Sequence, residues 1–393
     1  MDSLIYLDNA ATAKMSREVF EAMQPYFCEE YWNPSSAYSV SGALAQKVQR
    51  SREVFSGLLG CDSKEIYFTG GGSESDNWAI KGVADALIGC GKHVITSAIE
   101  HHAVLHTCKF LEDHGFEVTY LPVDENGLVD TAQLEAAIRP DTVLISIMTA
   151  NNEIGTIEPV KEIGQIAKKH NVYFHTDAVQ AFGHIPIDVN DMNIDLLSAS
   201  AHKIGGPKGV GLMYIRKGTK ISNLIHGGAQ ERGMRAGTVN AAGIIGFAQA
   251  AKIASEKMKE NADHERALRD RLIERVLEEI PYSRLNGDRK MRLPNNANFC
   301  FRYVEGESLL IMLDKNGICA SSGSACTSGS LDPSHVLLAI GLPHEIAHGS
   351  LRLTLSPETT ARDIDRTVDT LKTVVQRLRE MSPLYEDMKG ETK

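Results

Sequence analysis

The feature that most constrains the fold of this chain is an alternation of apolar, β-rich runs with amphipathic helical patterns between residues 65 and 215. Apolar runs that end in turn residues predict strands buried on both faces. We expect seven of them, at 65–69, 93–97, 117–121, 142–148, 172–175, 196–199 and 210–215, with helices at 103–115, 131–138 and 160–170. This order predicts an α/β fold with a mostly parallel seven-stranded sheet that helices cover on both faces. In such sheets the site lies beyond the carboxyl ends of the strands.

The second half of the chain has a different pattern. A long, charged helical region begins near Ala242, and apolar runs at 298–303 and 350–355 predict strands. Ser356 followed by Pro357 predicts the start of the last helix, since a capping residue before proline is typical of a helix N-terminus. Strands grouped apart from helices indicate a smaller α+β domain, and we expect the first strand, at 4–7, to join it. The predicted limits are 14–255 for the large domain, and 1–13 with 256–393 for the small domain.

Composition narrows the classes of function. The chain has 393 residues, too many for one small core, and a net charge of −10 without a basic stripe, so we expect no direct nucleic-acid partner. It has no apolar run of membrane-spanning length, and its short acidic N-terminus is not typical of a signal peptide. The seven cysteines are odd in number and form no C-x-x-C pair. This cysteine usage indicates reduced thiols and a cytoplasmic protein without membrane contact.

Two charged residues stand where predicted strands end. Lys203 follows the run at 196–199 and precedes a Gly-Gly-Pro turn, where its stem would lie beside buried backbone. Such surroundings favour the free amine, which a lysine needs in order to form a Schiff base. Asp177 ends the preceding run, and a carboxylate there could keep the pyridine nitrogen of pyridoxal phosphate protonated. Taken alone, both residues would also fit a structural role at strand ends.

A glycine-rich turn at 70–73 opens a helix, and backbone N–H groups at a helix N-terminus bind anions. The turn lacks the third glycine of a dinucleotide fingerprint and the Gly-Lys-Ser/Thr of a Walker loop, so a plain tight turn stays an alternative. His101 comes just after a predicted strand, where it could stack on a cofactor ring and shuttle protons.

Two histidine patterns raise the question of a metal. His102 and His106 are four residues apart, and residues 344–348 read His-Glu-Ile-Ala-His, the helix motif of zinc proteases. The second segment is too short for the helix of a protease, and neither pattern has an evident third ligand. We therefore expect no intrinsic metal and keep a zinc hydrolase as a remote alternative.

Two further residues suggest reactivity and recognition. Cys326 lies in a small, polar, glycine-rich run at 321–330, where a thiol would be exposed and reactive once deprotonated. Cys319 ends an apolar run, which indicates a core residue. Arg352 alternates with leucines in a predicted strand, and an arginine that projects into a cleft can clamp a carboxylate with two hydrogen bonds. A surface arginine on a half-exposed strand is the alternative.

Together these motifs resemble the NifS/IscS group of cysteine desulfurases, in the class V aminotransferase family of fold-type I pyridoxal-phosphate enzymes. The resemblance runs from 6 to 384. Its motifs are Ser-Glu-Ser-Asp-Asn (73–77), Glu-His (100–101), Asn-Asn-Glu (151–153), His-Thr-Asp-Ala-Val-Gln (175–180), Ala-His-Lys (201–203), Glu-Arg-Gly-Met-Arg-Ala-Gly-Thr (231–238) and Ser-Ser-Gly-Ser-Ala-Cys-Thr-Ser (321–328). The last motif separates this group from the SufS-like group. Two departures, Ala13 after Thr12 and Tyr38 after Ala37, lie in the N-terminal segment near the expected cleft.

The resemblance implies a role for each matched residue. Lys203 would bind the cofactor as a Schiff base and move protons, and Cys326 would attack sulfur. His101 would stack on the ring and act as acid or base, and Asp177 would pair with the pyridinium. The remaining implied contacts are Gln180 with the phenolic oxygen, Asn152 with ring and substrate, Gly72, Ser73, Ser200 and His202 with the phosphate, Thr238 with the phosphate of the other subunit, and Arg352 with Asn33 at the substrate carboxylate.

The implied reaction converts L-cysteine to L-alanine and leaves a persulfide on Cys326. A homodimer is implied, and so is a protein sulfur acceptor such as an iron–sulfur scaffold, with Cys326 at most a transient iron–sulfur ligand. Another pyridoxal-phosphate enzyme of this fold, a selenocysteine lyase or β-lyase, is the main alternative, and it would not depend on Cys326. A non-catalytic sulfur-carrier scaffold is a further alternative, against which the retention of Lys203, Asp177 and His101 argues.

Overall fold

The computed structural model describes residues 4–322 and 333–386. Its larger part is built on the predicted seven-stranded sheet, whose strands have the order β2-β8-β7-β6-β5-β3-β4. β8 runs antiparallel to both of its neighbours, and the other pairs are parallel. The strands are β2 (Ile66–Thr69), β3 (His93–Ser97), β4 (Glu117–Leu121), β5 (Thr142–Ser146), β6 (Tyr173–Asp177), β7 (Leu196–Ser200) and β8 (Gly211–Ile215).

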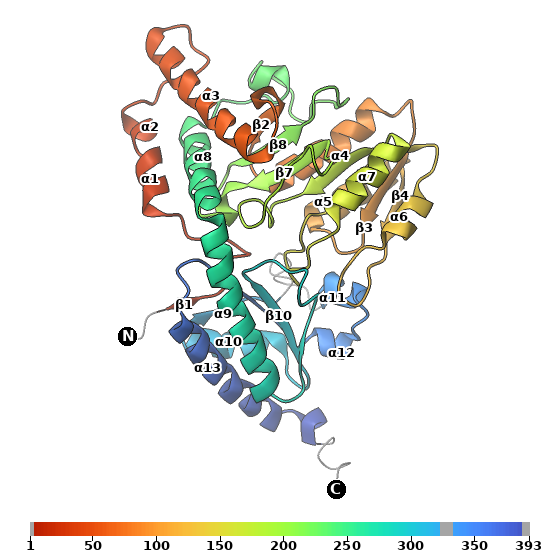
Figure 1. Ribbon diagram of the computed structural model, residues 1–393, viewed down its shortest axis with the longest axis vertical. Coiled ribbons are helices and arrows are strands. Elements are labelled where there is room, and N and C mark those ends of the chain that lie inside the picture. The colour runs from red at the N-terminus through yellow and green to blue at the C-terminus, as the bar shows by residue number, and fades with distance from the viewer. Residues whose placement is uncertain (1–3, 323–332, 387–393) are drawn as a thin grey trace.

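Helices pack on both faces of this sheet (Figure 1). The helices of this part of the chain are α1 (Arg17–Met23), α2 (Pro25–Cys28), α3 (Ser39–Leu59), α4 (Gly72–Ala86), α5 (His102–Asp113), α6 (Thr131–Ala137), α7 (Val160–His170) and α8 (Ala241–Glu256). α3, α6, α7 and α8 contribute to the core on one face, and α4 and α5 to the core on the other.

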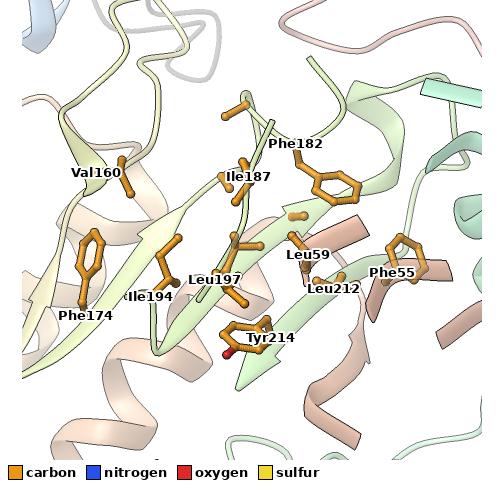
Figure 2. Close-up of a cluster of buried hydrophobic side chains, with 14 of the residues drawn as sticks. Phe55, Leu59, Val160, Phe174, Phe182, Ile187, Ile194, Leu197, Leu212 and Tyr214 are labelled. Carbon is orange, nitrogen blue, oxygen red and sulfur yellow. The ribbon is translucent and has the colours of Figure 1, made fainter. Parts of the chain in front are cut away.

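Successive residues of the central strands point to opposite faces, as the pleat of a strand requires. Leu197 and Leu212 pack on the same side as Leu59 of α3 (Figure 2), whereas Leu196 and Met213 pack against α4 and α5. The central strands are therefore buried on both sides, which explains why their sequences are continuously apolar.

The smaller part has a core of its own, formed by α9, α10, α13 and the strands of a three-stranded sheet with the order β12-β10-β9. Its elements are α9 (Met258–Glu279), β9 (Ser283–Leu285), β10 (Asn296–Phe301), α10 (Gly306–Lys315), β11 (Ile318–Cys319), α11 (His335–Ala339), α12 (His344–Ala347), β12 (Ser350–Thr354) and α13 (Ala361–Glu380). The first strand, β1 (Ile5–Tyr6), pairs with β11 in parallel, so the start of the chain joins this part.

Among the differences from the sequence prediction, two concern the helices of the second half of the chain. The last helix begins at Ala361 instead of just after Ser356, because Thr360 and Asp363 form a capping box there, while Ser356 hydrogen-bonds to Thr359 in a preceding turn. The long helical region from Ala242 is two helices, α8 and α9, which meet at Lys257 and run from the larger to the smaller part (Figure 1). The proposed domain limits stay a prediction.

Candidate active site

One cavity of about 330 Å³ lies where β6 and β7 end, beside the N-terminus of α4 and close to β12. The segment that follows β1 closes one side of it through Ala10 and Ala11. Ten of the residues predicted from the sequence line this cavity: Gly72, Ser73, His101, Asn152, Asp177, Gln180, Ser200, His202, Lys203 and Arg352. The parallel strands thus bring together residues that are far apart in the sequence, as their shared carboxyl edge predicts.

Lys203 ends a short 3₁₀ turn that follows β7. Its Nζ donates hydrogen bonds to the carbonyl oxygens of Ala10 (2.5 Å) and Ala11 (2.9 Å). Gln180 donates to the same Ala10 carbonyl at 3.0 Å. These contacts hold the amine against the backbone carbonyls of the N-terminal segment, which line the cavity. Sequence reasoning missed both alanines, because a backbone carbonyl leaves no mark in the residue type.

Asp177 is the last residue of β6 and is buried. Its Oδ1 accepts a hydrogen bond from the backbone N–H of Val179 at 2.8 Å. Burial raises the pKa of Asp177 to about 6, although the Val179 N–H and the positive charge of Lys203 oppose that shift. At neutral pH the group is therefore an ionised carboxylate in an apolar setting, which suits a cationic ring nitrogen.

The N-terminus of α4 forms the anion-binding end of the cavity. Gly72 is its first residue and packs against Val179 so closely that a Cβ on Gly72 would lie 2.6 Å from Val179 Cγ2. Only glycine lets the helix start approach here. Ser73, Ser200 and His202 line the same end. Free N–H groups, two hydroxyls and an imidazole are a suitable donor set for a phosphate group.

His101 caps the N-terminus of α5, and its Nδ1 accepts the N–H of Ala103 at 3.1 Å. The proton of the neutral ring is therefore on Nε2. Burial, followed by the charge of Lys203, lowers the pKa of His101 to about 4. His202 contacts Thr12 (3.2 Å between Nδ1 and Oγ1), and burial likewise lowers its pKa to about 4. Both rings are neutral at physiological pH.

Arg352 of β12 is 2% exposed. Its Nη1 donates to the carbonyl oxygen of Asn152 (3.0 Å) and its Nη2 to Asp8 Oδ1 (2.9 Å). Its buried Nε has no hydrogen-bond partner in the described ranges 4–322 and 333–386. A buried donor without an acceptor beside a cavity favours binding of a carboxylate. The backbone of Arg352 also pairs with Ser321, through Arg352 N to Ser321 O at 2.6 Å.

Some predicted residues lie elsewhere. Asn33 and Thr238 are exposed and do not line the cavity, and Cys326 lies outside the described residues. Cys319 is half-buried, so the expectation of a core residue was wrong. Its neighbour Ile318 on β11 is buried in the core, and successive residues of a strand point to opposite faces. The structure adds Asp76, Glu153 and His335 to the cavity wall. The signal for Asp76 is its place one helical turn after Gly72. A polar residue on that face of α4 points at the same site.

The two histidine patterns differ in the structure: the first lies among other histidine rings, and the second forms a very short helix. The rings of His102 and His106 lie 5.1 Å apart between centroids, and those of His102 and His335 4.8 Å apart. Within the described part of the chain, His, Cys, Asp and Glu side chains form no group of three or more that could hold a metal ion. The pattern at 344–348 forms α12, a helix of four residues.

Comparisons with known proteins agree with this geometry. The profile of the Aminotransferase class-V family matches residues 5–367. The chain is 57% identical over 380 residues to cysteine desulfurase IscS of Methanosarcina thermophila, which covers 97% of this chain and 94% of that protein. Among solved structures, it is similar to a NifS-like protein (TM-score 0.90, 39% identity, 95% and 99% of the two chains). It is also similar to SspA in complex with cysteine (TM-score 0.80, 39% identity, 91% and 100%).

The family uses pyridoxal phosphate, and the cavity fits that group: a lysine amine, a buried carboxylate and a helix N-terminus face one space. These features agree with the sequence motifs and with relatives over nearly the whole chain. The chain belongs to the class-V aminotransferase family of pyridoxal-phosphate enzymes, in its cysteine desulfurase group.

Proposed function

We propose that this cysteine desulfurase takes the sulfur atom of L-cysteine in the cavity around Lys203 and transfers it to Cys326. One observation carries this proposal: the Lys203 amine, the Asp177 carboxylate and the Arg352 guanidinium line a single cavity. The amine and carboxylate suit the cofactor, and the guanidinium suits an amino acid's carboxylate. A lyase of the same fold would use the first two groups as well, so the fate of the sulfur decides between them.

The residues that would hold pyridoxal phosphate divide into two ends. Gly72, Ser73, Ser200 and His202 would bind the phosphate, and Asp177 would hold the ring nitrogen protonated. Lys203 would supply the amine that holds the aldehyde group, Gln180 would meet the phenolic oxygen, and His101 and Asn152 would contact the ring. When bound, the protonated ring withdraws electrons from the substrate's Cα.

The chain's own groups then orient the substrate and move its protons. Arg352 binds the α-carboxylate through its unpaired Nε and the neighbouring Nη, with Asp8 and Asn152 fixing the plane of the guanidinium. The amine of Lys203 accepts the proton from Cα, and the neutral ring of His101 can accept the proton of the substrate thiol.

The sulfur then passes to Cys326 in a balanced exchange. The Cys326 thiolate forms an S–S bond to the substrate sulfur, the C–S bond of the substrate breaks, and its carbon atom gains a proton. The products are L-alanine and a persulfide, so no external oxidant is required. Support comes from Ser321, whose backbone pairs with Arg352: the segment that leads to Cys326 starts beside the carboxylate clamp.

Product analysis tests this assignment. Purified protein with pyridoxal phosphate is incubated anaerobically with L-cysteine and a thiol reductant, and alanine and sulfide are quantified. We expect equal amounts of both from the unchanged protein and from Cys319→Ser, the matched control in the same region. Cys326→Ser should bind L-cysteine, as seen in the cofactor's absorption, but release almost no sulfide. Full activity in Cys326→Ser would instead support a lyase.

A homodimer is part of the proposal, because Thr238 is exposed and lies away from its own cavity. We place it at the phosphate end of the partner's site. Mixing tests this directly. Subunits with Lys203→Ala and subunits with Thr238→Ala are each impaired, and a mixed dimer contains one site with both native residues. Recovery of activity on mixing supports the proposal, and a monomer in sedimentation would contradict it.

The sulfur acceptor and the compartment also remain proposals. We infer a cytoplasmic enzyme that serves a protein acceptor such as an iron–sulfur scaffold, without a nucleic-acid or membrane partner. The six described cysteines are free, and the net charge is −10. Helices of the described residues include none that is long and apolar enough to cross a membrane. Transfer of labelled sulfur from L-cysteine to an added scaffold protein, measured by mass, tests the acceptor.

A further inference from the structure

A second carboxyl group lies buried beside Asp177. Asp76 is on α4, lines the same cavity and is 1% exposed. Its Oδ1 has no hydrogen-bond partner within residues 4–322 and 333–386. An ionised carboxylate oxygen in such a place would lack any compensating donor, which is costly in a buried site.

The nearest basic side chain does not supply a positive charge. His175 of β6 is fully buried, with its Nδ1 at 2.8 Å from Ser146 Oγ and its Nε2 at 3.0 Å from Ser198 Oγ. Its Nε2 lies 3.7 Å from Asp76 Oδ1. Burial lowers the pKa of His175 to about 3, so the ring is neutral at any pH at which the enzyme works. The contact with Asp76 is therefore not an ion pair.

The ionisable groups that act on Asp76 are acidic. Asp177 approaches from β6 and Glu100 from the turn before α5. Burial and the negative charge of Asp177 raise the pKa of Asp76 well above its usual range, and the hydroxyl of Ser198 only partly opposes this. Lys203 acts on Asp177 and favours ionisation there. The two carboxyl groups therefore have unequal surroundings. The positive charge of Lys203 stabilises the ionised form of Asp177, whereas the charges that act on Asp76 are negative.

We propose that Asp76 stays protonated in the working enzyme and is a positioning residue for Asp177, so that the two carboxyls carry one negative charge and that charge is kept on Asp177. The proposal rests on the assignment of Asp177 to the cofactor's ring nitrogen. A negative charge on Asp76 would compete with Asp177 for the proton of the cofactor's ring nitrogen and would change the protonation of that ring. Held neutral, Asp76 fixes the charge state of the site without adding to it.

The test compares three replacements in the holoenzyme. Asp76→Asn keeps the shape and a donor but cannot ionise, Asp76→Ala removes both, and Asp177→Asn is the control for the cofactor assignment. We measure the pH at which the cofactor's visible absorption changes, the dissociation constant of pyridoxal phosphate, and the infrared carbonyl band of a protonated carboxylic acid.

We expect the unchanged holoenzyme to show the carboxylic-acid band at pH 8, and Asp76→Asn to lose that band but to keep the spectral pKa and the cofactor affinity. Asp76→Ala, which removes the carboxyl group altogether, should likewise lose the band and keep the spectral pKa. Because burial also raises the pKa values of Glu100, Glu158 and Glu265, the band is assigned by its loss in the variant. If Asp76 is ionised, Asp76→Asn loses no carboxylic-acid band and lowers the spectral pKa by about one unit or more. Either finding overturns the proposal, as does a lowered spectral pKa in Asp76→Ala.

The control separates this proposal from the cofactor assignment. Asp177→Asn should weaken cofactor binding strongly whether or not Asp76 is protonated. If Asp177→Asn binds pyridoxal phosphate normally, the assignment of Asp177 has failed. If it does not, and Asp76→Asn also shifts the spectrum, only the role of Asp76 has failed. Should Asp76→Ala not fold, the asparagine variant and the infrared band still decide the question.

Discussion

Replacing Arg352 by lysine tests the carboxylate clamp, because lysine keeps the positive charge and removes the planar fork. In the structure the guanidinium donates to Asn152 O at 3.0 Å and to Asp8 Oδ1 at 2.9 Å, and its buried Nε has no partner among the described residues. An ammonium group can replace the charge but cannot keep both of these bonds and present a second donor to a ligand.

The expected loss follows from that geometry. A hydrogen bond to a charged group contributes about 1.5–3 kcal/mol, and losing one such bond to the ligand corresponds to a roughly 10- to 150-fold weaker affinity. The loss applies only to ligands that carry a carboxylate. The corresponding amine that lacks only the carboxylate should bind equally well to both proteins.

The assay is a titration of the holoenzyme with L-alanine and with ethylamine, followed by the cofactor's absorption. Arg352→Lys should weaken L-alanine binding by the predicted factor and leave ethylamine binding within about twofold. Arg284→Lys, at an exposed position on β9 of the same sheet, is the matched control and should change neither. Equal losses of affinity for both ligands in Arg352→Lys would show that Arg352 does not bind the carboxylate.

Three further predictions follow from other contacts. Arg52→Ala should lower the free energy of unfolding by about 3–5 kcal/mol in chemical denaturation, since it leaves Glu231 buried without its partner; the bonds lost are 2.8 and 2.9 Å long. Lys14→Ala, which breaks an exposed ion pair, is the control, and an equal effect would contradict this reasoning. Gly72→Ala should weaken pyridoxal-phosphate binding at least about tenfold in equilibrium dialysis, since its Cβ clashes at the helix start; unchanged affinity would exclude this end as the phosphate site. Cofactor affinity should also fall as the pH is lowered through about 6, the pKa of Asp177, because protonation removes the charge that holds the ring nitrogen. The apoprotein should instead become more stable as the pH is lowered, because between pH 3.8, the ordinary pKa of the group, and about 6 the folded state binds a proton that the unfolded state does not. A cofactor affinity that does not change across this pH range would contradict the assignment of Asp177 to the ring nitrogen.

The large sheet could be predicted because each central strand is buried on both faces and is therefore continuously apolar. Leu196 and Leu197 illustrate this, since they pack on opposite sides of β7. The start of α13 could not be placed, because Ser356 and Thr360 are both good capping residues and the capping box with Asp363 decides between them. The three-residue strand β9 was missed, since it is too short for an alternation to be recognised.

Much of the site could be predicted because its side chains follow strands that share one edge. Lys203 and Asp177 are examples, each placed directly after or at the end of a strand. The partners that complete it come from the N-terminal segment, which reaches the cavity only through the tertiary fold. Asp8 binds Arg352 across 344 positions in the sequence, and no local pattern could indicate that contact.

The central claim is that Cys326 receives the sulfur atom of L-cysteine, and peptide mass analysis tests it most directly. The holoenzyme is treated with one equivalent of L-cysteine, without reductant, and digested. The account predicts one added sulfur atom on the peptide that carries Cys326, with one alanine released for each sulfur bound. Sulfur on a different cysteine, or free sulfide with no sulfur bound to the protein, would contradict it.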